Sequence, residues 1–273
     1  MGKVSFENIY PFDLAQTLDC GQSFRWTKNE DGSFTGVVKD KVATASYSDG
    51  TLTIECNGKV DETLWREYFD LDLDYADIKD DLSKMHPVLA QASVYAGGIR
   101  ILKQDPFEAL ITFIISQNNN IERIKGIVSR LCENFGECID DTHYTFPSAK
   151  KLASLSSDDL APIRAGFRNR YIVDAAQKVA SGEVDLEKLR TMDYLQAQKE
   201  LMKIVGVGVK VADCVLLYGL HRLESFPLDV WMKRAMAALF PGMTAEDFGQ
   251  YAGIAQQYIF HYRRMNPKLF EQT

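Results

Sequence analysis

The chain has 273 residues and a formal net charge of −7 at neutral pH, with 46% hydrophobic and 25% charged residues. These proportions are typical of a protein that folds around a hydrophobic core, and they exclude a disordered chain, a collagen and a disulfide scaffold. The negative charge argues at first sight against a nucleic-acid binder, because such proteins usually carry a basic surface.

The charge is unevenly distributed along the chain. Residues 1–100 contain 10 Lys and Arg against 17 Asp and Glu, whereas residues 101–273 contain 21 of each. Much of the acidic excess lies at 61–81. The net charge of the whole chain is therefore a poor guide to its partners.

Cysteine spacing, histidine spacing and the N-terminal segment exclude several further classes. The five cysteines form no C-x-x-C pair and the four histidines share no ligand spacing, so we expect reduced thiols and no zinc site. Residues 1–14 lack the apolar core of a signal peptide. The longest strongly apolar run, Ala109–Ile115, is far shorter than the ~20 residues of a membrane span. These features predict a cytoplasmic protein without a membrane partner, and they fit a prokaryotic cell.

The N-terminal third has the pattern of an antiparallel sheet. Phe34–Val38, Val42–Tyr47 and Leu52–Cys56 are short segments rich in β-branched and aromatic residues. A Ser-Asp-Gly turn signal at 48–50 separates the last two. No strand pattern of comparable quality follows residue 60.

Helical patterns dominate from about residue 62. Asp105 fits an N-cap and Pro106 the first helical position, so a helix is expected to start there and to run through the core. Amphipathic helices are further predicted at 121–135, 148–154, 171–180, 196–204, 209–220, 230–239 and 245–264. The expected fold class is α+β, with an antiparallel β-sheet domain at 1–104 and an α-helical domain at 105–273.

The segment at 201–217 places a glycine hairpin between two helices. Gly206, Val207 and Gly208 separate an apolar helix from a second helix that opens at about Val209. Glycines let backbone N–H groups approach an anion, and the second helix directs its N-terminal amides outward. The segment is thus a candidate phosphate-binding helix–hairpin–helix, and a plain corner between packed helices is the alternative.

Two residues near this hairpin suit covalent catalysis. Lys210 stands in the first turn of the second helix, where the positive helix end disfavours an ammonium ion and favours the nucleophilic amine. Asp229 lies 19 residues later, at the expected N-cap of the next helix. An exposed lysine and a simple N-cap are the ordinary structural interpretations of these two residues.

Six separated motifs form a recognisable set. They are GQSFRW at 21–26, QNNNIERI at 117–124, GFRNRY at 166–171, GVGVKVADC at 206–214, PLDVW at 227–231 and YAGIAQQYIF at 251–260. Together they resemble the 8-oxoguanine DNA glycosylase/AP lyase family of the helix–hairpin–helix (HhH-GPD) superfamily, over about residues 10–265. Each motif alone also fits an ordinary loop or amphipathic helix, but the combination is far more specific than any member.

The resemblance implies a pocket for an oxidised base. The carbonyl of Gly21 would accept a hydrogen bond from N7–H, which 8-oxoguanine has and guanine lacks. Gln256 would read the Watson–Crick edge, Phe260 would stack on the base, and Cys214 would contribute to the same pocket.

The resemblance also implies contacts to the opposite strand. Asn118 would fill the gap left by the flipped base, and Arg123 and Arg168 would contact the orphaned cytosine. Phe167 would be the aromatic wedge inserted into the base stack.

The implied reaction is base excision followed by strand cleavage. Lys210 would displace the base at C1′ and form an imine with the opened sugar, while Asp229 stabilises positive charge on the sugar. β-Elimination would then cleave the strand, with no catalytic metal, redox cofactor or iron–sulfur cluster. The expected partner is double-stranded DNA containing 8-oxoguanine, preferably opposite cytosine, bound by a monomer.

The same resemblance places the DNA phosphates on the hairpin of Gly206, Val207 and Gly208, with a monovalent cation as a possible companion at its carbonyls. The acidic segment at 61–81 should then face away from the duplex. Two alternatives stay open: an HhH glycosylase for another damaged base, and a non-catalytic HhH module that only holds DNA. Lys210 argues against the glycosylases that lack lyase activity, and Trp231 departs from the histidine that eukaryotic members usually carry.

Overall fold

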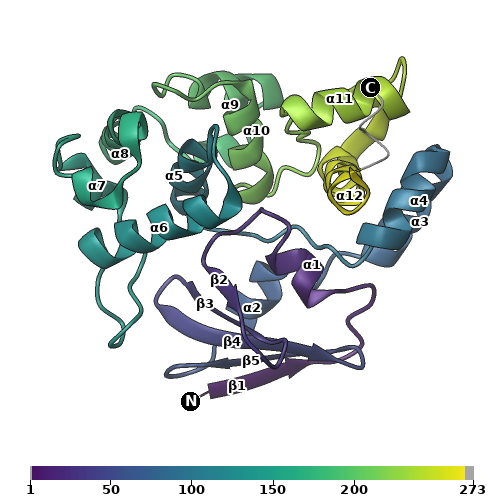
Figure 1. The fold of residues 1–273 in the computed structure, drawn as a ribbon, viewed down its shortest axis with the longest axis horizontal. Coiled ribbons are helices and arrows are strands. Elements are labelled where there is room, and N and C mark those ends of the chain that lie inside the picture. Colours follow the sequence, from purple (N-terminus) through teal and green to yellow (C-terminus); the bar gives the residue numbers. More distant parts are fainter. Residues whose placement is uncertain (1, 268–273) are drawn as a thin grey trace.

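The computed structural model describes residues 2–267, which form a small sheet layer beneath a larger group of helices (Figure 1). The five strands pair antiparallel throughout, in the order β1-β5-β4-β3-β2. Their bounds are β1 Gly2–Phe6, β2 Trp26–Lys28, β3 Phe34–Val38, β4 Lys41–Ser48 and β5 Thr51–Cys56. The predicted α+β class, with its N-terminal antiparallel sheet, is confirmed.

β1 and β2 extend the sheet beyond the three strands that the sequence pattern indicates. Both are edge strands, since β1 pairs only with β5 and β2 only with β3. β2 has only three residues, and β1 is exposed or partly exposed at every position except Phe6. Short edge strands bury little and alternate weakly, so their sequences carry little strand signal.

Helices build the rest of the described chain. Their bounds are α1 Leu14–Leu18, α2 Glu62–Tyr68, α3 Tyr75–Met85, α4 Pro87–Ala96, α5 Pro106–Ser116, α6 Ile121–Phe135, α7 Ala149–Ala153, α8 Asn169–Ser181, α9 Tyr194–Leu201, α10 Val209–Tyr218, α11 Val230–Leu239 and α12 Ala252–Met265, with the 3₁₀ turns η1 Ala161–Ile163, η2 Gly166–Arg168, η3 Lys188–Arg190 and η4 Ala245–Tyr251. α5 starts as predicted, because the Asp105 carboxylate accepts hydrogen bonds from the N–H groups of Phe107 and Glu108 at 2.9 Å each. No helix within residues 2–267 is both long enough and apolar enough to cross a membrane.

The continuous helix predicted at 245–264 is wrong. The structure divides this segment into the 3₁₀ turn η4 and the α-helix α12, and Gly249, inside η4, has φ 64° and ψ −149°. L-residues avoid this conformation, so a glycine there breaks the helix. The break leaves α12 free to begin at Ala252, next to the cavity described below.

Two hydrophobic cores result. The smaller covers the sheet and includes Trp26, Phe34 and Trp65, all almost wholly buried. The larger fills the helical group around α5, eight of whose residues are buried. Although α3 and α4 precede residue 105, they pack on this larger core, with α4 lying against α12. The division at 104/105 itself stays a prediction, and residues 268–273 of its second part lie outside the described residues.

A buried glutamine joins the sheet side to the helical side. The Gln22 side chain is completely buried and donates from Nε2 to the carbonyls of Thr17 and Arg100, at 2.8 Å each. Its Oε1 accepts from the Leu102 N–H at 3.0 Å. Because every polar atom of this side chain is engaged, the backbone around Gly21 is fixed against the linker that leads into α5.

Candidate functional site

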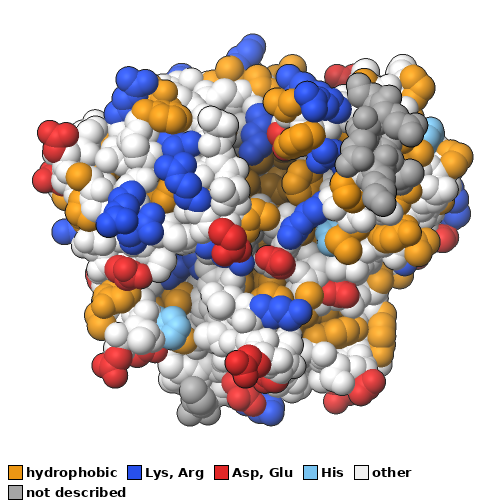
Figure 2. All heavy atoms as spheres, in the orientation of Figure 1, with side chains coloured by type: hydrophobic (Ala, Val, Ile, Leu, Met, Phe, Trp, Pro, Cys, Tyr) orange, Lys and Arg blue, Asp and Glu red, His pale blue; other side chains and the backbone are white. Residues whose placement is uncertain are grey.

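Most of the predicted site residues meet at one cavity of about 1170 Å³. It lies between α10, α11 and α12, the segment that follows α1, and residues 117–120, which we call the asparagine loop. Its lining includes Gly21, Asn118, Gly208, Lys210, Cys214, Asp229, Gln256 and Phe260. Figure 2 shows a hollow among the helices with hydrophobic side chains inside and Lys and Arg side chains around it.

The hairpin before α10 leaves backbone groups open on one side. Gly206 adopts φ 82°, and a Cβ there would lie 2.4 Å from the Tyr171 ring, so both conformation and packing require glycine. A Cβ on Gly208 would meet nothing within 4 Å. Val207 is buried, and its N–H donates to the Ile204 carbonyl at 3.0 Å. The turn is therefore fixed by the packing of Gly206 and Val207 against the protein, while Gly208 stays accessible to a ligand.

Lys210 is the second residue of α10 and reaches into the cavity. Its Nζ lies 5.5 Å from the centroid of the Phe113 ring, and the side chain is half-buried. Cys214 stands one turn further along α10, and burial raises the pKa of its thiol to about 11, against an opposing charge and hydrogen bond from Lys210. The amine therefore sits between an aromatic face and a neutral thiol, in a place where water is partly excluded.

Asp229 lies at the N-cap of α11, as predicted. Its carboxylate accepts a hydrogen bond from the Met232 N–H at 2.6 Å. Its charge also acts on the Cys214 thiol, where it raises the pKa in opposition to Lys210. The carboxylate and the amine therefore converge on one cavity wall from the starts of two different helices.

The four residues expected to contact a base surround the same space. Gln256 is buried, and its Nε2 donates to the Pro227 carbonyl at 3.3 Å. Phe260, one turn along α12, is partly exposed to the cavity. Gly21 adopts φ 91°, and no described residue donates a hydrogen bond to its carbonyl. The cavity thus combines an aromatic ring, an amide and an unoccupied carbonyl acceptor.

The asparagine loop forms the opposite wall. Asn118 is exposed and holds a left-handed backbone at φ 47°. Asn120 caps α6 by accepting from the Arg123 N–H at 2.9 Å. Arg123 itself is exposed in the first turn of α6 but does not line the cavity. These polar side chains project from a strained turn at the cavity mouth.

Phe167 and Arg168, in the 3₁₀ turn η2, differ sharply in exposure. Phe167 is 54% exposed, as a wedge would be, whereas Arg168 is 3% exposed. The Arg168 guanidinium donates to the carbonyls of Gln117, Asn118 and Ala165. Arg168 is therefore engaged within the protein, and its contact with a cytosine stays a prediction that requires these hydrogen bonds to exchange.

Several basic side chains near the cavity lack acidic partners, whereas Arg264 in its lining pairs with Asp19 at 3.9 Å. Within residues 2–267, Arg123, Lys210, Lys233 and Arg234 form no ion pair with a carboxylate within 4.0 Å. Exposed cations on the sheet and on α2 and α3 are paired instead, as Lys3–Glu55, Arg66–Asp72 and Lys84–Asp80 show. No described residue of 61–81 lines the cavity. The cavity lining holds three cations, Lys210, Lys233 and Arg264, against three carboxylates, Asp19, Glu122 and Asp229, so it lacks the acidic excess of the whole chain.

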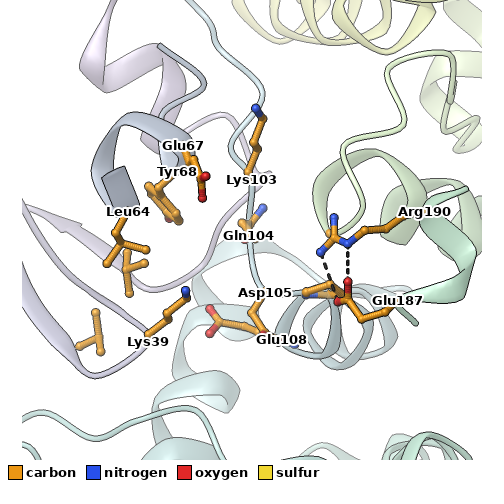
Figure 3. A pocket seen from close by; sticks show the side chains of 14 residues that line it. Lys39, Leu64, Glu67, Tyr68, Lys103, Gln104, Asp105, Glu108, Glu187 and Arg190 are labelled. Carbon is orange, nitrogen blue, oxygen red and sulfur yellow. Dashed lines mark hydrogen bonds and ion pairs between the residues drawn. The ribbon is translucent and has the colours of Figure 1, made fainter. Parts of the chain in front are cut away.

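A second cavity of about 390 Å³ lies between α2, the linker into α5 and the turn η3 (Figure 3). Its charged groups are largely neutralised by neighbours, with Arg190 paired to Glu187 at 2.7 Å and Lys103 paired to Asp70 at 2.9 Å. None of the predicted site residues lines it. The candidate chemistry therefore belongs to the larger cavity.

Known proteins share both parts of this architecture. Residues 5–110 match the family model for the 8-oxoguanine DNA glycosylase N-terminal domain, and residues 111–247 match that for HhH-GPD superfamily base excision DNA repair proteins. The chain belongs to the 8-oxoguanine DNA glycosylase family of the HhH-GPD superfamily.

Individual relatives agree with this assignment. The N-glycosylase/DNA lyase OGG1 of Arabidopsis thaliana is 31% identical, over 90% of this chain and 76% of the relative. The structure of MBOgg1 with a low affinity DNA ligand has a TM-score of 0.91 at 42% identity, covering 97% of this chain and 96% of that one. The Clostridium acetobutylicum 8-oxoguanine glycosylase/lyase, bound to double-stranded DNA with cytosine opposite 8-oxoG, has a TM-score of 0.90 at 36% identity and the same coverage.

Trp231 is the position at which this member departs from the expected family pattern. Its side chain is 48% exposed at the mouth of the cavity. The guanidinium carbons of Arg263 and Arg234 lie 4.1 and 5.2 Å from the indole centroid. Trp231 therefore does not simply pack inside, and it holds two cations beside Asp229.

Sequence reasoning missed several residues that shape the cavity. Phe113 lies beneath Lys210, and Tyr218 stacks on Phe113 with ring centroids 5.1 Å apart. Both belong to apolar runs that read as ordinary core, so no sequence signal separated them from their neighbours. Arg263 carries no sequence signal either, because Trp231, on which it stacks, lies on another helix.

Proposed function

We propose that this protein is a DNA repair enzyme that extrudes 8-oxoguanine from duplex DNA, preferably opposite cytosine, excises it, and cleaves the strand by β-elimination. One observation carries the proposal: Lys210 and Asp229 converge on a cavity that also holds the Gly21 carbonyl, Gln256 and Phe260. The named activities of the relatives, N-glycosylase/DNA lyase and 8-oxoguanine glycosylase/lyase, support it. A module that merely binds DNA phosphates needs none of these cavity residues.

The first chemical step is displacement of the base. The neutral amine of Lys210 forms a bond to C1′ while the bond from C1′ to the base breaks, and the base leaves with that electron pair and takes up a proton. Positive charge develops on the sugar during this step, and the Asp229 carboxylate stabilises it. Phe113 and Cys214 add no competing charge beside the amine, because an aromatic ring is neutral and the raised pKa keeps the thiol protonated.

The second step is strand cleavage. Opening of the sugar converts the Lys210 adduct into an imine, which acidifies the C2′ hydrogen. Loss of that proton expels the 3′ phosphate, and water then hydrolyses the imine and frees the lysine. Lys210 is both the nucleophile and the electron sink, so the sequence of steps uses side chains alone.

Selectivity for the oxidised base rests on Gly21. N7–H of 8-oxoguanine donates to the Gly21 carbonyl, whereas the N7 lone pair of guanine opposes it. A satisfied rather than unsatisfied buried polar contact is worth about 1–3 kcal/mol, or about 5–150-fold. This is too little to protect every guanine in a genome, so earlier steps of extrusion must add discrimination.

The proposal extends to the partners and the location of the protein. The hairpin amides bind DNA phosphates, and the carbonyls of Val205, Gly206 and Val207 would hold a monovalent cation. These three carbonyls accept no backbone hydrogen bond from a described residue, which fits oxygen ligands of a cation. We also propose a monomer that acts on the nucleoid of a prokaryotic cell, since one cavity takes one extruded base.

The experiment is a cleavage assay on matched duplexes. The protein is incubated with duplexes that carry 8-oxoguanine, 3-methyladenine or uracil opposite the same base, and with 8-oxoguanine opposite each of the four bases. We expect cleavage of the 8-oxoguanine duplexes, with cytosine opposite as the best substrate. Release of 3-methyladenine or uracil without strand cleavage would assign the protein to another branch of the superfamily.

A further inference from the structure

The buried guanidinium of Arg168 bridges two segments that are 50 residues apart in the sequence. One is the asparagine loop, and the other is the 3₁₀ turn 166–168, which we call the wedge segment. Arg168 is 3% exposed, while its neighbour Phe167 is 54% exposed. An arginine is rarely buried so completely unless its donors are satisfied inside the protein.

The hydrogen bonds of Arg168 cross from the wedge segment to the asparagine loop. Nε donates to the Gln117 carbonyl at 3.1 Å, and one Nη donates to the Gln117 and Asn118 carbonyls, the latter at 3.2 Å. The other Nη donates to the Ala165 carbonyl at 3.1 Å, within its own segment. The planar fork of a guanidinium suits this arrangement, because it holds several acceptors in one fixed geometry.

The same guanidinium also supports the wedge itself. Its central carbon lies 4.4 Å from the centroid of the Phe167 ring, and that ring packs edge-on against Tyr171 with centroids 5.7 Å apart. The face of the Arg168 guanidinium therefore contacts the wedge while its edge binds the asparagine loop. A displacement of either segment must therefore change the contacts of the other.

The asparagine loop connects this bridge to the base cavity. Gln117 and Asn118 both line the cavity, and Asn118 holds a left-handed backbone at φ 47°. Such a backbone persists only where its surroundings enforce it, and the two carbonyls held by Arg168 are part of those surroundings. Arg123 follows this loop in the first turn of α6 and is exposed.

We propose that Arg168 is a positioning residue that couples the wedge segment to the asparagine loop, so that insertion of Phe167 and filling of the gap by Asn118 occur as one step. The inference rests on the proposed function and adds to it. A residue that only contacts the opposite cytosine matters only when a cytosine is present. A coupling residue matters whichever base, or no base, lies opposite.

The experiment removes the opposite base. Extrusion is followed by the fluorescence of 2-aminopurine next to 8-oxoguanine, in one duplex with cytosine opposite and in another with a tetrahydrofuran abasic analogue opposite. Arg168→Met is expected to slow extrusion on both duplexes by about 10-fold or more, since several hydrogen bonds from a charged donor are lost. Arg123→Gln is expected to slow it only opposite cytosine.

Arg130→Met is the matched control. Arg130 also donates from Nε to a loop carbonyl, that of Ile163 at 3.0 Å, but it lies outside the cavity lining and the wedge segment. It should extrude at the rate of the unsubstituted protein. Normal extrusion by Arg168→Met on the duplex without an opposite base would overturn the coupling and leave Arg168 as a cytosine contact alone.

Two further measurements separate coupling from a general defect. Phe167→Ala combined with Arg168→Met should slow extrusion less than the product of the single effects, whereas independent effects would contradict the proposal. Borohydride trapping on a pre-formed abasic sugar should change by no more than about 2-fold in Arg168→Met, because no base has to leave the stack. If Arg168→Met loses trapping and also melts at a lower temperature, Arg168→Lys decides, because it keeps the charge but cannot bridge both carbonyls. Slow extrusion on both duplexes by a normally folded Arg168→Lys supports the coupling, and any other result for this variant overturns it. If the unsubstituted protein extrudes the base but does not excise it, the proposed function fails and the coupling stands.

Discussion

The two walls of the cavity are built in different ways. On one wall, Lys210 and Asp229 occupy the starts of α10 and α11, where helix geometry fixes their backbones. The opposite wall is the asparagine loop, which Arg168 links to the wedge segment outside the cavity lining. Left-handed backbones occur in or next to both segments, with φ 47° at Asn118, 59° at Arg164 and 64° at Gly166. The comparison indicates that the chemistry is set in place before DNA binds, whereas the contacts to the opposite strand rest on segments able to move.

The largest effect should come from the negative charge of Asp229, on the wall formed by the starts of α10 and α11, which we call the fixed wall. Asp229→Asn keeps an N-cap for α11, because asparagine caps helices as well as aspartate does, and removes only the negative charge. We expect base excision to fall by about 10²–10³-fold, measured by single-turnover cleavage. Asp193→Asn, at the N-cap of α9, is the matched control and should leave the rate unchanged. Full activity of Asp229→Asn would contradict the proposed electrostatic role of the Asp229 carboxylate.

The second largest effect should be on the selectivity for 8-oxoguanine over guanine, through Gly21. A Cβ on Gly21 would lie 3.6 Å from the Ile121 side chain, so there is space for alanine, but its φ of 91° is strained for any L-residue. Gly21→Ala is expected to shift the carbonyl and to reduce the preference for 8-oxoguanine over guanine by about 5–150-fold. The preference is measured as the ratio of excision rates. Gly32→Ala, at φ 87° with nothing within 4 Å, carries the same strain in the turn between β2 and β3 and should not alter that ratio. An unchanged ratio in Gly21→Ala would contradict the role of this carbonyl.

A smaller effect is expected at the mouth of the cavity. Arg263→Gln removes a cation that stacks on Trp231 beside Asp229. The slope of log affinity against log salt should fall by about 1 if one phosphate contact is lost. Affinity for a duplex with a tetrahydrofuran lesion is read by fluorescence anisotropy at several salt concentrations. Arg66→Gln, whose guanidinium lies 5.2 Å from the Phe6 ring on the sheet side, is the control and should keep the slope. An unchanged slope in Arg263→Gln would show that this cation contacts no phosphate.

The smallest effect concerns the thiol on the fixed wall. Burial raises the pKa of Cys214 to about 11, so the thiol stays neutral below that pH and forms the reactive thiolate only above it. At pH 8 we expect iodoacetamide to modify the exposed Cys138 much faster than Cys214, as mass mapping would show. Equal modification of both would mean that this wall opens more readily than its packing suggests.

The same contrast explains what the sequence predicted well. The hairpin glycines, the N-cap aspartates and the apolar run of α5 are local signals, because one or two residues determine each of them. The helix starts at Pro106 and Val230 follow the predicted positions. The cavity residues then meet because these helices pack on one core.

Features that depend on partners far along the chain could not be predicted from the local sequence pattern. In the sequence Gln22 resembles an ordinary polar residue. Its complete burial depends on hydrogen bonds to Arg100 and Leu102, about 80 residues later. Arg168 follows an exposed aromatic in a basic stretch, so exposure was the natural expectation. Its burial depends on carbonyls of the asparagine loop, about 50 residues earlier.

The most direct test of the whole account is the covalent intermediate. The protein is incubated with a duplex bearing 8-oxoguanine opposite cytosine, borohydride is added to reduce any imine, and the adduct is mapped by peptide mass. The account predicts a stable protein–DNA adduct on Lys210 that is absent from Lys210→Gln. Excision without an adduct, or an adduct on another lysine that survives in Lys210→Gln, would contradict it.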